Sequence, residues 1–234
     1  MALAQETKES IQKLFRDYGG AIFLAVLVSW VIRSFGIEAY RIPSSSMRPT
    51  LEPGDTVFVA KYPFGFRNPW NGNRVSKGRA PDLGEVVVFS APSDPDRDTL
   101  KRVVGIAGDR IKVQGGRVFR NGVDQSVQAQ VAAGACGKEK AGTVTFEVCH
   151  EPPLLEVSEE VVVPEGQVFV LGDLRSRPSD PLTFHSSGLV PVANMKGRAM
   201  WIWISIEPST QGGSGTGFSR IRFDRMLRKL EARG

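Results

Sequence analysis

The sequence predicts a mainly β domain that follows a single N-terminal transmembrane helix. A charge-poor apolar segment lies near the N-terminus, and the chain changes character after Arg41. From there, short runs rich in Val, Ile and Phe recur between Gly, Pro and Asn residues, which is typical of strands and turns. Because no long stretch with a helical apolar repeat interrupts these runs, we expect a β-sheet domain over residues 38–208.

Residues 18–37 are the expected transmembrane helix. These 20 residues contain one charged side chain, Arg33. At the helical rise they span about 30 Å, enough to cross a bilayer if Arg33 reaches the interface, where Trp30 would also fit. A cleavable signal sequence and a buried helix are the alternatives. The charged leader, residues 1–17, is long for a signal sequence, and Arg33 directly precedes the candidate cleavage pattern of residues 34–36.

The positive charges favour a cytoplasmic N-terminus. Three Lys or Arg residues precede the apolar segment, whereas Arg33 and Arg41 are the two counted after it. Residues 1–17 are therefore expected in the cytoplasm, and residues 38–208 on the extracytoplasmic side of the plasma (inner) membrane.

The strands expected in the β domain are short. Gly115-Gly116 and Asn121-Gly122 have the composition of hairpin turns, residues 62–83 of a long loop, and residues 121–143 of an insertion. A Gly-rich link then leads to a basic C-terminal helix within residues 209–234. The apolar stripe expected to dock that helix is Ile221, Met226, Leu227 and Leu230. The strands are expected at residues 55–61, 84–90, 100–107, 110–114, 117–120, 144–148, 154–163, 167–171 and 196–206.

The composition speaks against two kinds of ligand. The formal net charge is +5, but no basic run with interleaved aromatic residues indicates a nucleic-acid partner. With two cysteines, Cys136 and Cys149, and two histidines, the chain is poorly supplied for a structural zinc site. In an oxidising exterior compartment the two cysteines would form a disulfide, and two free thiols are the alternative.

Three consecutive serines, Ser44, Ser45 and Ser46, are the first candidates for chemistry. Such a run is usually a polar loop, but here prolines on both sides restrict the backbone and apolar residues surround the hydroxyls. A serine nucleophile needs a base. Both histidines lie far downstream and no nucleophile-elbow motif accompanies them, so a Ser-His-Asp triad has no support.

Lys101 is the alternative base. It lies in a segment that is otherwise largely apolar and strand-like. An apolar environment removes the solvation of a charged amine, lowers its pKa and makes the neutral form available. A solvated lysine on an edge strand is the plainer interpretation.

Four segments together resemble the bacterial type I signal peptidases, which are Ser/Lys serine peptidases. They are Ile-Pro-Ser-Ser-Ser-Met-Arg-Pro-Thr-Leu at residues 42–51, Gly-Glu-Val-Val-Val-Phe at 84–89, Lys-Arg-Val-Val-Gly-Ile-Ala-Gly-Asp at 101–109 and Gly-Asp-Leu-Arg at 172–175. The resemblance extends from the apolar segment through residue 206. It implies an antiparallel β core like that of signal peptidases and SOS-repressor proteases. It also implies an enzyme that cleaves signal peptides of exported preproteins after Ala-x-Ala-like sequences at the lipid bilayer.

The resemblance also implies roles for single residues. Ser46 would be the nucleophile and Lys101 its general base, while the backbone N–H of Ser46 and the hydroxyl of Ser44 would form the oxyanion hole. Ser45 stands where many members have glycine. No metal or cofactor is implied. The apolar substrate pocket would be formed by Ile42, Pro43, Met47, Leu51, Val88 and Leu100.

The fourth segment departs from the family pattern. Pro178 aligns with the serine that orients the lysine in other members, and Leu182 with an arginine. Proline has no side-chain donor or acceptor, so the resemblance alone does not say which group orients Lys101. Ser179 is the first candidate and Ser176 the second, with water or a backbone carbonyl as the plainer alternative.

Two other functions compete with this hypothesis. A self-cleaving SOS-type peptidase would share the β core, but the chain opens with an apolar segment of membrane length. A catalytically dead, membrane-anchored binding protein would explain the altered fourth segment, but Ser46 and Lys101 are both present.

Overall fold

The computed structural model describes residues 18–30, 36–66, 75–91, 94–127, 134–155, 157–176, 188–208 and 220–230. A helix covers residues 18–30, and its side chains are largely exposed. Among the described residues, no helix combines the length and apolar character needed to cross a membrane. The transmembrane helix expected at residues 18–37 therefore stays a prediction.

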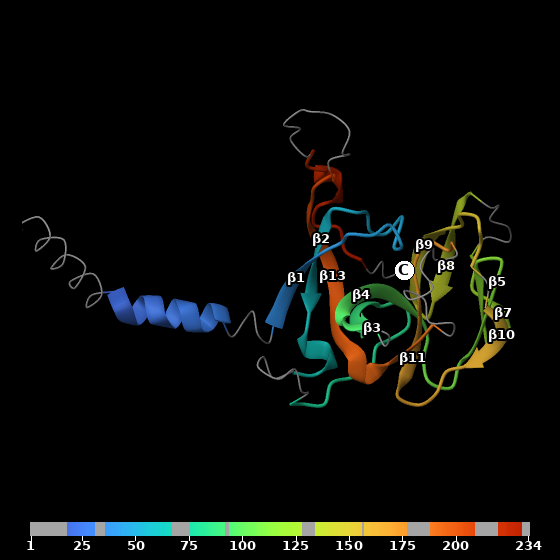
Figure 1. The fold of residues 1–234 in the computed structure, drawn as a ribbon, viewed down its shortest axis with the longest axis horizontal. Coiled ribbons are helices and arrows are strands. Elements are labelled where there is room, and N and C mark those ends of the chain that lie inside the picture. The colour runs from blue at the N-terminus through green and yellow to red at the C-terminus, as the bar shows by residue number, and fades with distance from the viewer. Residues whose placement is uncertain are drawn as a thin grey trace, which may run out of the picture.

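Antiparallel strands make up the rest of the described fold, which confirms the mainly β class (Figure 1). The largest sheet has seven strands in the order β1-β2-β13-β3-β4-β11-β12. In that order their bounds are Ile37–Arg41, Asp55–Ala60, Met195–Ser205, Val86–Ala91, Asp94–Gly105, Gln167–Leu171 and Leu189–Pro191.

Two smaller sheets lie beside it (Figure 1). One has four strands in the order β10-β5-β6-β7, with bounds Val157–Val162, Arg110–Gln114, Arg117–Arg120 and Val123–Asp124. The other is the hairpin of β8 (Cys136–Ala141) and β9 (Val144–Cys149). Short 3-10 turns occur at Tyr62–Phe64, Val192–Asn194 and Phe223–Arg225.

The central strand β3 contains a continuous apolar run, residues 86–89, and its place in the sheet explains this run. Val86 and Val88 contribute to one core cluster, whereas Val87 and Phe89 contribute to another. Because successive side chains of a strand point to opposite faces, a strand covered on both faces needs apolar residues at every position. The first cluster also contains Met47 and lies under the serine loop.

The expected turns and the disulfide are present. Asn121 and the three glycines of the two predicted turns have positive φ angles, as tight hairpin turns require. Cys136 and Cys149 face each other across β8 and β9 and form a disulfide. The expected insertion, residues 121–143, thus contains β7 and β8. Strand β8 belongs to the hairpin that the disulfide closes.

The C-terminal segment differs from the expectation. Residues 220–230 form one 3-10 turn and strand-like contacts instead of a helix. The backbone N–H of Leu227 donates to Ile202 and that of Leu230 to Met200, so the segment continues the pairing of β13. Of the expected apolar stripe only Leu230 is buried, at 4% exposed, while Leu227 stays exposed.

Arginine side chains fix this segment to the sheet. Arg222 and Arg225 both donate to the carboxylate of Asp55, which is buried at the start of β2 and also accepts from the hydroxyl of Ser205. These buried ion pairs favour an extended path along β13 over an independent helix.

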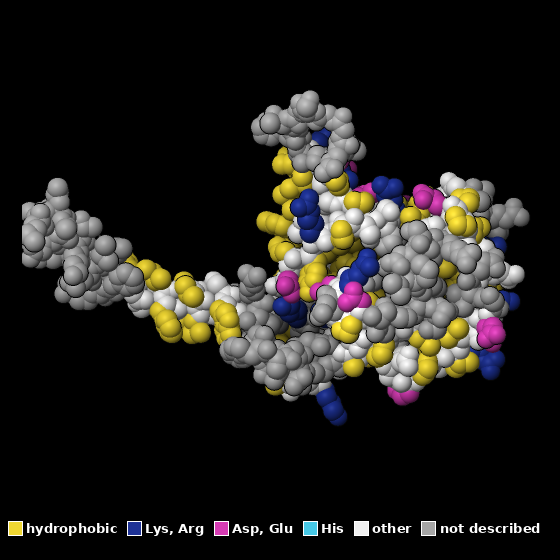
Figure 2. All heavy atoms as spheres, in the orientation of Figure 1, with side chains coloured by type: hydrophobic (Ala, Val, Ile, Leu, Met, Phe, Trp, Pro, Cys, Tyr) yellow, Lys and Arg dark blue, Asp and Glu magenta, His cyan; other side chains and the backbone are white. Residues whose placement is uncertain are grey.

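Apolar side chains also remain on the outside of the domain. Figure 2 shows hydrophobic side chains along the helix and along the side of the sheet that β1, β2 and β13 form. Exposed apolar residues of β1, β13 and the C-terminal segment include Ile37, Trp203, Ile221, Phe223 and Leu227.

Candidate active site

The serine loop connects β1 to β2 and is fixed by its apolar residues. Met47 and Leu51 are buried in the core, and the N–H of Leu51 donates to the carbonyl of Met47 at 2.9 Å. This turn holds the preceding serines at the surface of the core. Ser46 is half-buried and Ser44 is exposed.

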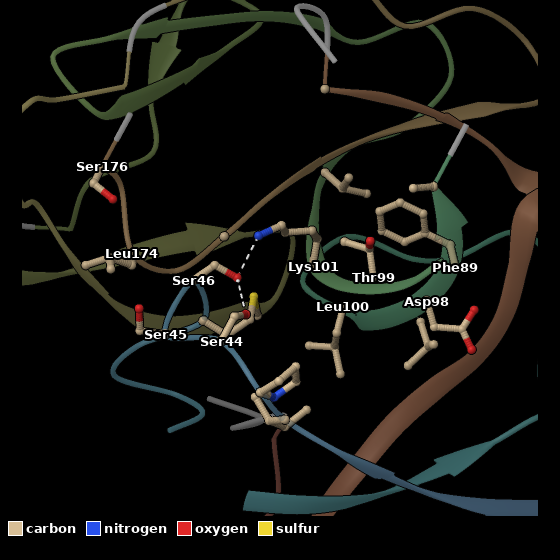
Figure 3. Close-up of a pocket in the computed structure, with 18 of the residues that line it drawn as sticks. Ser44, Ser45, Ser46, Phe89, Asp98, Thr99, Leu100, Lys101, Leu174 and Ser176 are labelled. Carbon is tan, nitrogen blue, oxygen red and sulfur yellow. Dashed lines mark hydrogen bonds between the residues drawn. The ribbon is translucent and has the colours of Figure 1, made fainter. Parts of the chain in front are cut away.

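The structure brings Ser46 and Lys101 into direct contact. Lys101 lies on β4 opposite Val87 of β3, and its Nζ atom is 2.7 Å from the Oγ atom of Ser46. The hydroxyl oxygens of Ser44 and Ser46 are 3.3 Å apart. Figure 3 shows these three side chains converging, while the side chain of Ser45 points away from Lys101.

Burial of the Lys101 amine favours its neutral form. Desolvation lowers its pKa to about 8, against the opposing attraction of the Asp173 carboxylate, which raises it. The neutral amine is therefore accessible near neutral pH, as a general base requires.

The dyad opens into a cavity of about 610 Å³. Five of the six expected pocket residues line it: Ile42, Pro43, Met47, Val88 and Leu100. The sixth, Leu51, is fully buried in the core beneath the loop and is not part of the cavity wall. Tyr40, Phe89, Thr99, Leu174 and Leu189 also line the cavity, and none of them is among the pocket residues expected from the sequence.

Gly172 allows the loop after β11 to approach the dyad. A Cβ atom at this position would lie 2.3 Å from the carbonyl oxygen of Ser46 and 3.4 Å from the Nζ atom of Lys101. The N–H of Leu174 donates to the same carbonyl of Ser46 at 3.1 Å. Only glycine permits this backbone contact, because any side chain would push the loop away.

A buried ion pair holds the next residue of that loop. The carboxylate of Asp173 accepts from Nε and Nη2 of Arg102 at 2.8 and 2.7 Å, and both side chains are fully buried. The hydroxyl of Thr50 also donates to Asp173. Asp173 thereby connects the serine loop to β4, the strand that carries Lys101.

Of the two candidates for orienting Lys101, the structure describes Ser176 but not Ser179. Ser176 lines the cavity, but Figure 3 places it apart from Lys101, and no hydrogen bond joins the two in the part of the chain that the structure describes. Ser179 lies outside the described residues. Both assignments therefore stay predictions.

Some residues of the site carried a sequence signal that could have been used. Thr50, Arg102 and Gly172 all lie inside the four family-like segments, next to residues with an expected role. Glu139, which accepts two hydrogen bonds from Arg175, lies in the presumed insertion and had no such signal.

The chain is similar to known proteins over most of its length. The family model described as "Signal peptidase, peptidase S26" matches residues 15–204. A signal peptidase I of Pseudomonas fluorescens is 32% identical over 210 residues, covering 83% of this chain and 74% of that protein. A signal peptidase I of Pseudomonas aeruginosa is 30% identical over 233 residues, covering 90% and 79%.

Solved structures are also similar to the chain, as one example shows. A signal peptidase I of Enterococcus faecalis V583 shares 27% identity, covers 51% of this chain and 97% of its own, and has a TM-score of 0.33.

Proposed function

The chain belongs to the signal peptidase family, peptidase S26, and acts as a signal peptidase I, a serine endopeptidase; on this premise we propose that Ser46 is its nucleophile and Lys101 its general base. The observation that carries the proposal is the 2.7 Å contact between the Lys101 amine and the Ser46 hydroxyl. The lowered pKa of Lys101 supports it, because only the neutral amine accepts a proton.

In the acylation step, neutral Lys101 takes the proton of Ser46 as Oγ attacks the scissile carbonyl carbon. The carbonyl oxygen becomes an oxyanion, which the N–H of Ser46 and the hydroxyl of Ser44 stabilise. The tetrahedral intermediate then collapses, and the Lys101 ammonium protonates the leaving amine of the mature protein. The signal peptide remains bound to Ser46 as an ester.

In the deacylation step, Lys101 is again neutral and takes a proton from the attacking water. The second tetrahedral intermediate collapses with release of Ser46, which regains its proton from Lys101. The signal peptide leaves with a new carboxylate at its C-terminus. Bonds and protons balance without a metal or a cofactor.

We propose that the cavity selects small residues before the cleaved bond. Its wall near the dyad is formed by Ile42, Pro43, Val88 and Leu100, and apolar side chains of this kind exclude bulky or charged groups. An Ala-x-Ala-like sequence fits this requirement.

The membrane location is also part of the proposal. A helix within residues 18–36, before β1 begins, would anchor the enzyme, and the exposed apolar residues of β1, β13 and the C-terminal segment suit contact with a lipid surface. Signal peptides reach the site from the same bilayer. The catalytic domain would lie on the extracytoplasmic side, and nucleic acid has no place among the proposed partners.

The test uses the full chain in detergent and a preprotein whose signal peptide ends in Ala-x-Ala. We expect one cut at the signal junction by the wild-type protein. Ser46→Ala should leave a folded protein with at most a few per cent of the turnover, because no neighbouring serine has the same contact with Lys101. Retained activity in that variant would transfer the nucleophile to Ser44 or Ser45, and an inactive wild-type protein would support a binding role.

A further inference from the structure

Glu139 is a buried carboxylate in the β8–β9 hairpin, outside all four family-like segments. It is 1% exposed. Its two oxygens accept from the two terminal nitrogens of Arg175, from Nη1 at 2.7 Å and from Nη2 at 2.5 Å. The Arg175 side chain is fully buried as well. This is a bidentate pair in a dry environment, the geometry in which a guanidinium is most rigidly held.

Arg175 transmits this constraint to the dyad. Its Nε atom donates to the carbonyl oxygen of Gly172 at 2.8 Å, and its Nη1 atom also donates to the carbonyl of Gly116. Gly172 is the residue at which an added Cβ atom would lie 2.3 Å from the carbonyl oxygen of Ser46 and 3.4 Å from the Nζ atom of Lys101. Two successive contacts therefore connect the carboxylate of Glu139 to the peptide that packs on the dyad.

The same hairpin holds this loop through its backbone. The N–H of Cys149 donates to the carbonyl of Asp173 at 2.9 Å, and the N–H of Arg175 donates to the carbonyl of Cys149 at 2.7 Å. These bonds lie on either side of Leu174, whose N–H binds Ser46. The disulfide with Cys136 closes the hairpin at the same end.

A second series of contacts connects the hairpin to the loop after β11. Glu139 pairs with Phe146 across the hairpin, and the ring of Phe146 lies under the guanidinium of Arg102 at 4.1 Å from its centroid. Arg102 is the partner of Asp173. The hairpin thus contacts both arginines that fix the loop after β11.

We infer that Glu139 is a positioning residue for the Ser46–Lys101 dyad, acting through Arg175 and the carbonyl of Gly172. Arginine keeps its charge at any working pH, and a buried charge requires a partner. Without the carboxylate, Arg175 must turn toward water and release Gly172. The loop then no longer packs tightly on Lys101. This inference rests on the proposed dyad.

The test compares Glu139→Gln with Asp124→Asn in the full chain. Both variants replace a carboxylate that accepts from an arginine, but Asp124 pairs with Arg117, and among the described residues no hydrogen bond joins it to the loop of residues 172–176. We expect Glu139→Gln to lower kcat roughly ten- to a hundredfold, with KM changed by less than about twofold, and Asp124→Asn to behave like the wild type.

The pH profile separates positioning from loss of folded enzyme. A smaller folded fraction lowers kcat at every pH. It does not change the pH at which kcat falls on the acid side of the profile, the acid limb. A loosened loop admits water to Lys101, so its pKa rises from about 8 toward the ordinary value and the acid limb of Glu139→Gln moves to higher pH. Wild-type kcat with an unmoved acid limb would overturn the inference, as would a lowered kcat with an unmoved limb.

The double variant Glu139→Leu with Arg175→Met removes the pair without leaving a buried charge, which commonly preserves folding. We expect its thermal midpoint to stay near that of the wild type while kcat remains low, because Gly172 has lost its donor. Wild-type kcat in a folded double variant would overturn the inference. If the double variant does not fold, the position of the acid limb in the pH profile of Glu139→Gln is the test of the inference. If the proposed assignment of Ser46 and Lys101 is wrong, Ser46→Ala will retain activity, and this result is separate from those of the Glu139 variants.

Discussion

The backbone N–H of Leu174 donates to the carbonyl oxygen of Ser46 at 3.1 Å. The loop after β11 therefore holds the peptide group of the proposed nucleophile itself. Gly172 lies on the same carbonyl, and Asp173 binds Thr50 of the serine loop. The geometry of the dyad thus depends on two segments that are far apart in the sequence.

The neutral form of Lys101 should set the pH dependence. Because the amine works as a base only when unprotonated, kcat/KM should fall as the pH decreases through about 8, the lowered pKa of Lys101. Lys101→Arg should be inactive, since a guanidinium keeps its proton. The measurement is a pH–rate profile of preprotein cleavage. An active arginine variant would remove Lys101 from the role of base, and an acid limb near the pKa of a free lysine would contradict the lowering of its pKa by burial.

Gly172→Ala should impair catalysis more than folding. The added Cβ atom would lie 2.3 Å from the carbonyl oxygen of Ser46, so the loop must move away from the dyad. We expect kcat to fall roughly tenfold or more while the circular dichroism spectrum stays that of a β protein. Gly20→Ala is the control, because its Cβ atom would meet nothing within 4 Å. Equal kcat in both variants would show that the close approach has no catalytic role.

Ser179→Ala should lower turnover roughly ten- to a hundredfold with little change in substrate binding, if this serine orients the amine of Lys101. A flexible lysine spends most of its time in unproductive rotamers unless an acceptor holds it. The comparison variant is Ser176→Ala, assayed for kcat and KM with the same preprotein. A larger loss in Ser176→Ala would transfer the role to Ser176. No loss in either would assign it to water or a backbone carbonyl.

The disulfide should stabilise the hairpin that supports the loop. Unreduced, denatured protein should show no reactive thiol, because Cys136 and Cys149 are paired. Replacing both cysteines by alanine should lower the free energy of unfolding by about 2–3 kcal/mol, the scale for a short closed loop. Thiol titration and urea unfolding measure these two quantities. Two titrated thiols in the unreduced protein would contradict the pairing.

The strands that were predictable are those with a strong local pattern. Arg110–Gln114, Arg117–Arg120 and Gln167–Leu171 were bounded correctly, because β-branched residues end at glycine-containing turns on at least one side. Ser46 and Lys101 were predictable for another reason. Their surrounding segments resemble the signal peptidases, and this resemblance led us to expect the two side chains in one site, where the structure brings them into contact.

The features that were not predictable depend on partners distant in the sequence. β1 (Ile37–Arg41) follows the apolar segment without a clear alternation of its own and forms by pairing with β2. The C-terminal segment shows a rough helical stripe, but Arg222 and Arg225 bind Asp55 and draw it along β13. Glu139 lies in a polar stretch, and nothing local indicates that Arg175 is its partner.

The burial of Leu230 beside Met47 and Leu51 has a consequence for biosynthesis. Chains fold as they emerge, beginning from the N-terminal side. The apolar support under Ser46 is complete only when residue 230 has left the ribosome and laid its segment along β13. Until then, the nascent chain carries both dyad residues without the packing that holds the serine loop in place. We therefore expect proteolytic activity to appear only after residues 220–230 have emerged and packed on the sheet.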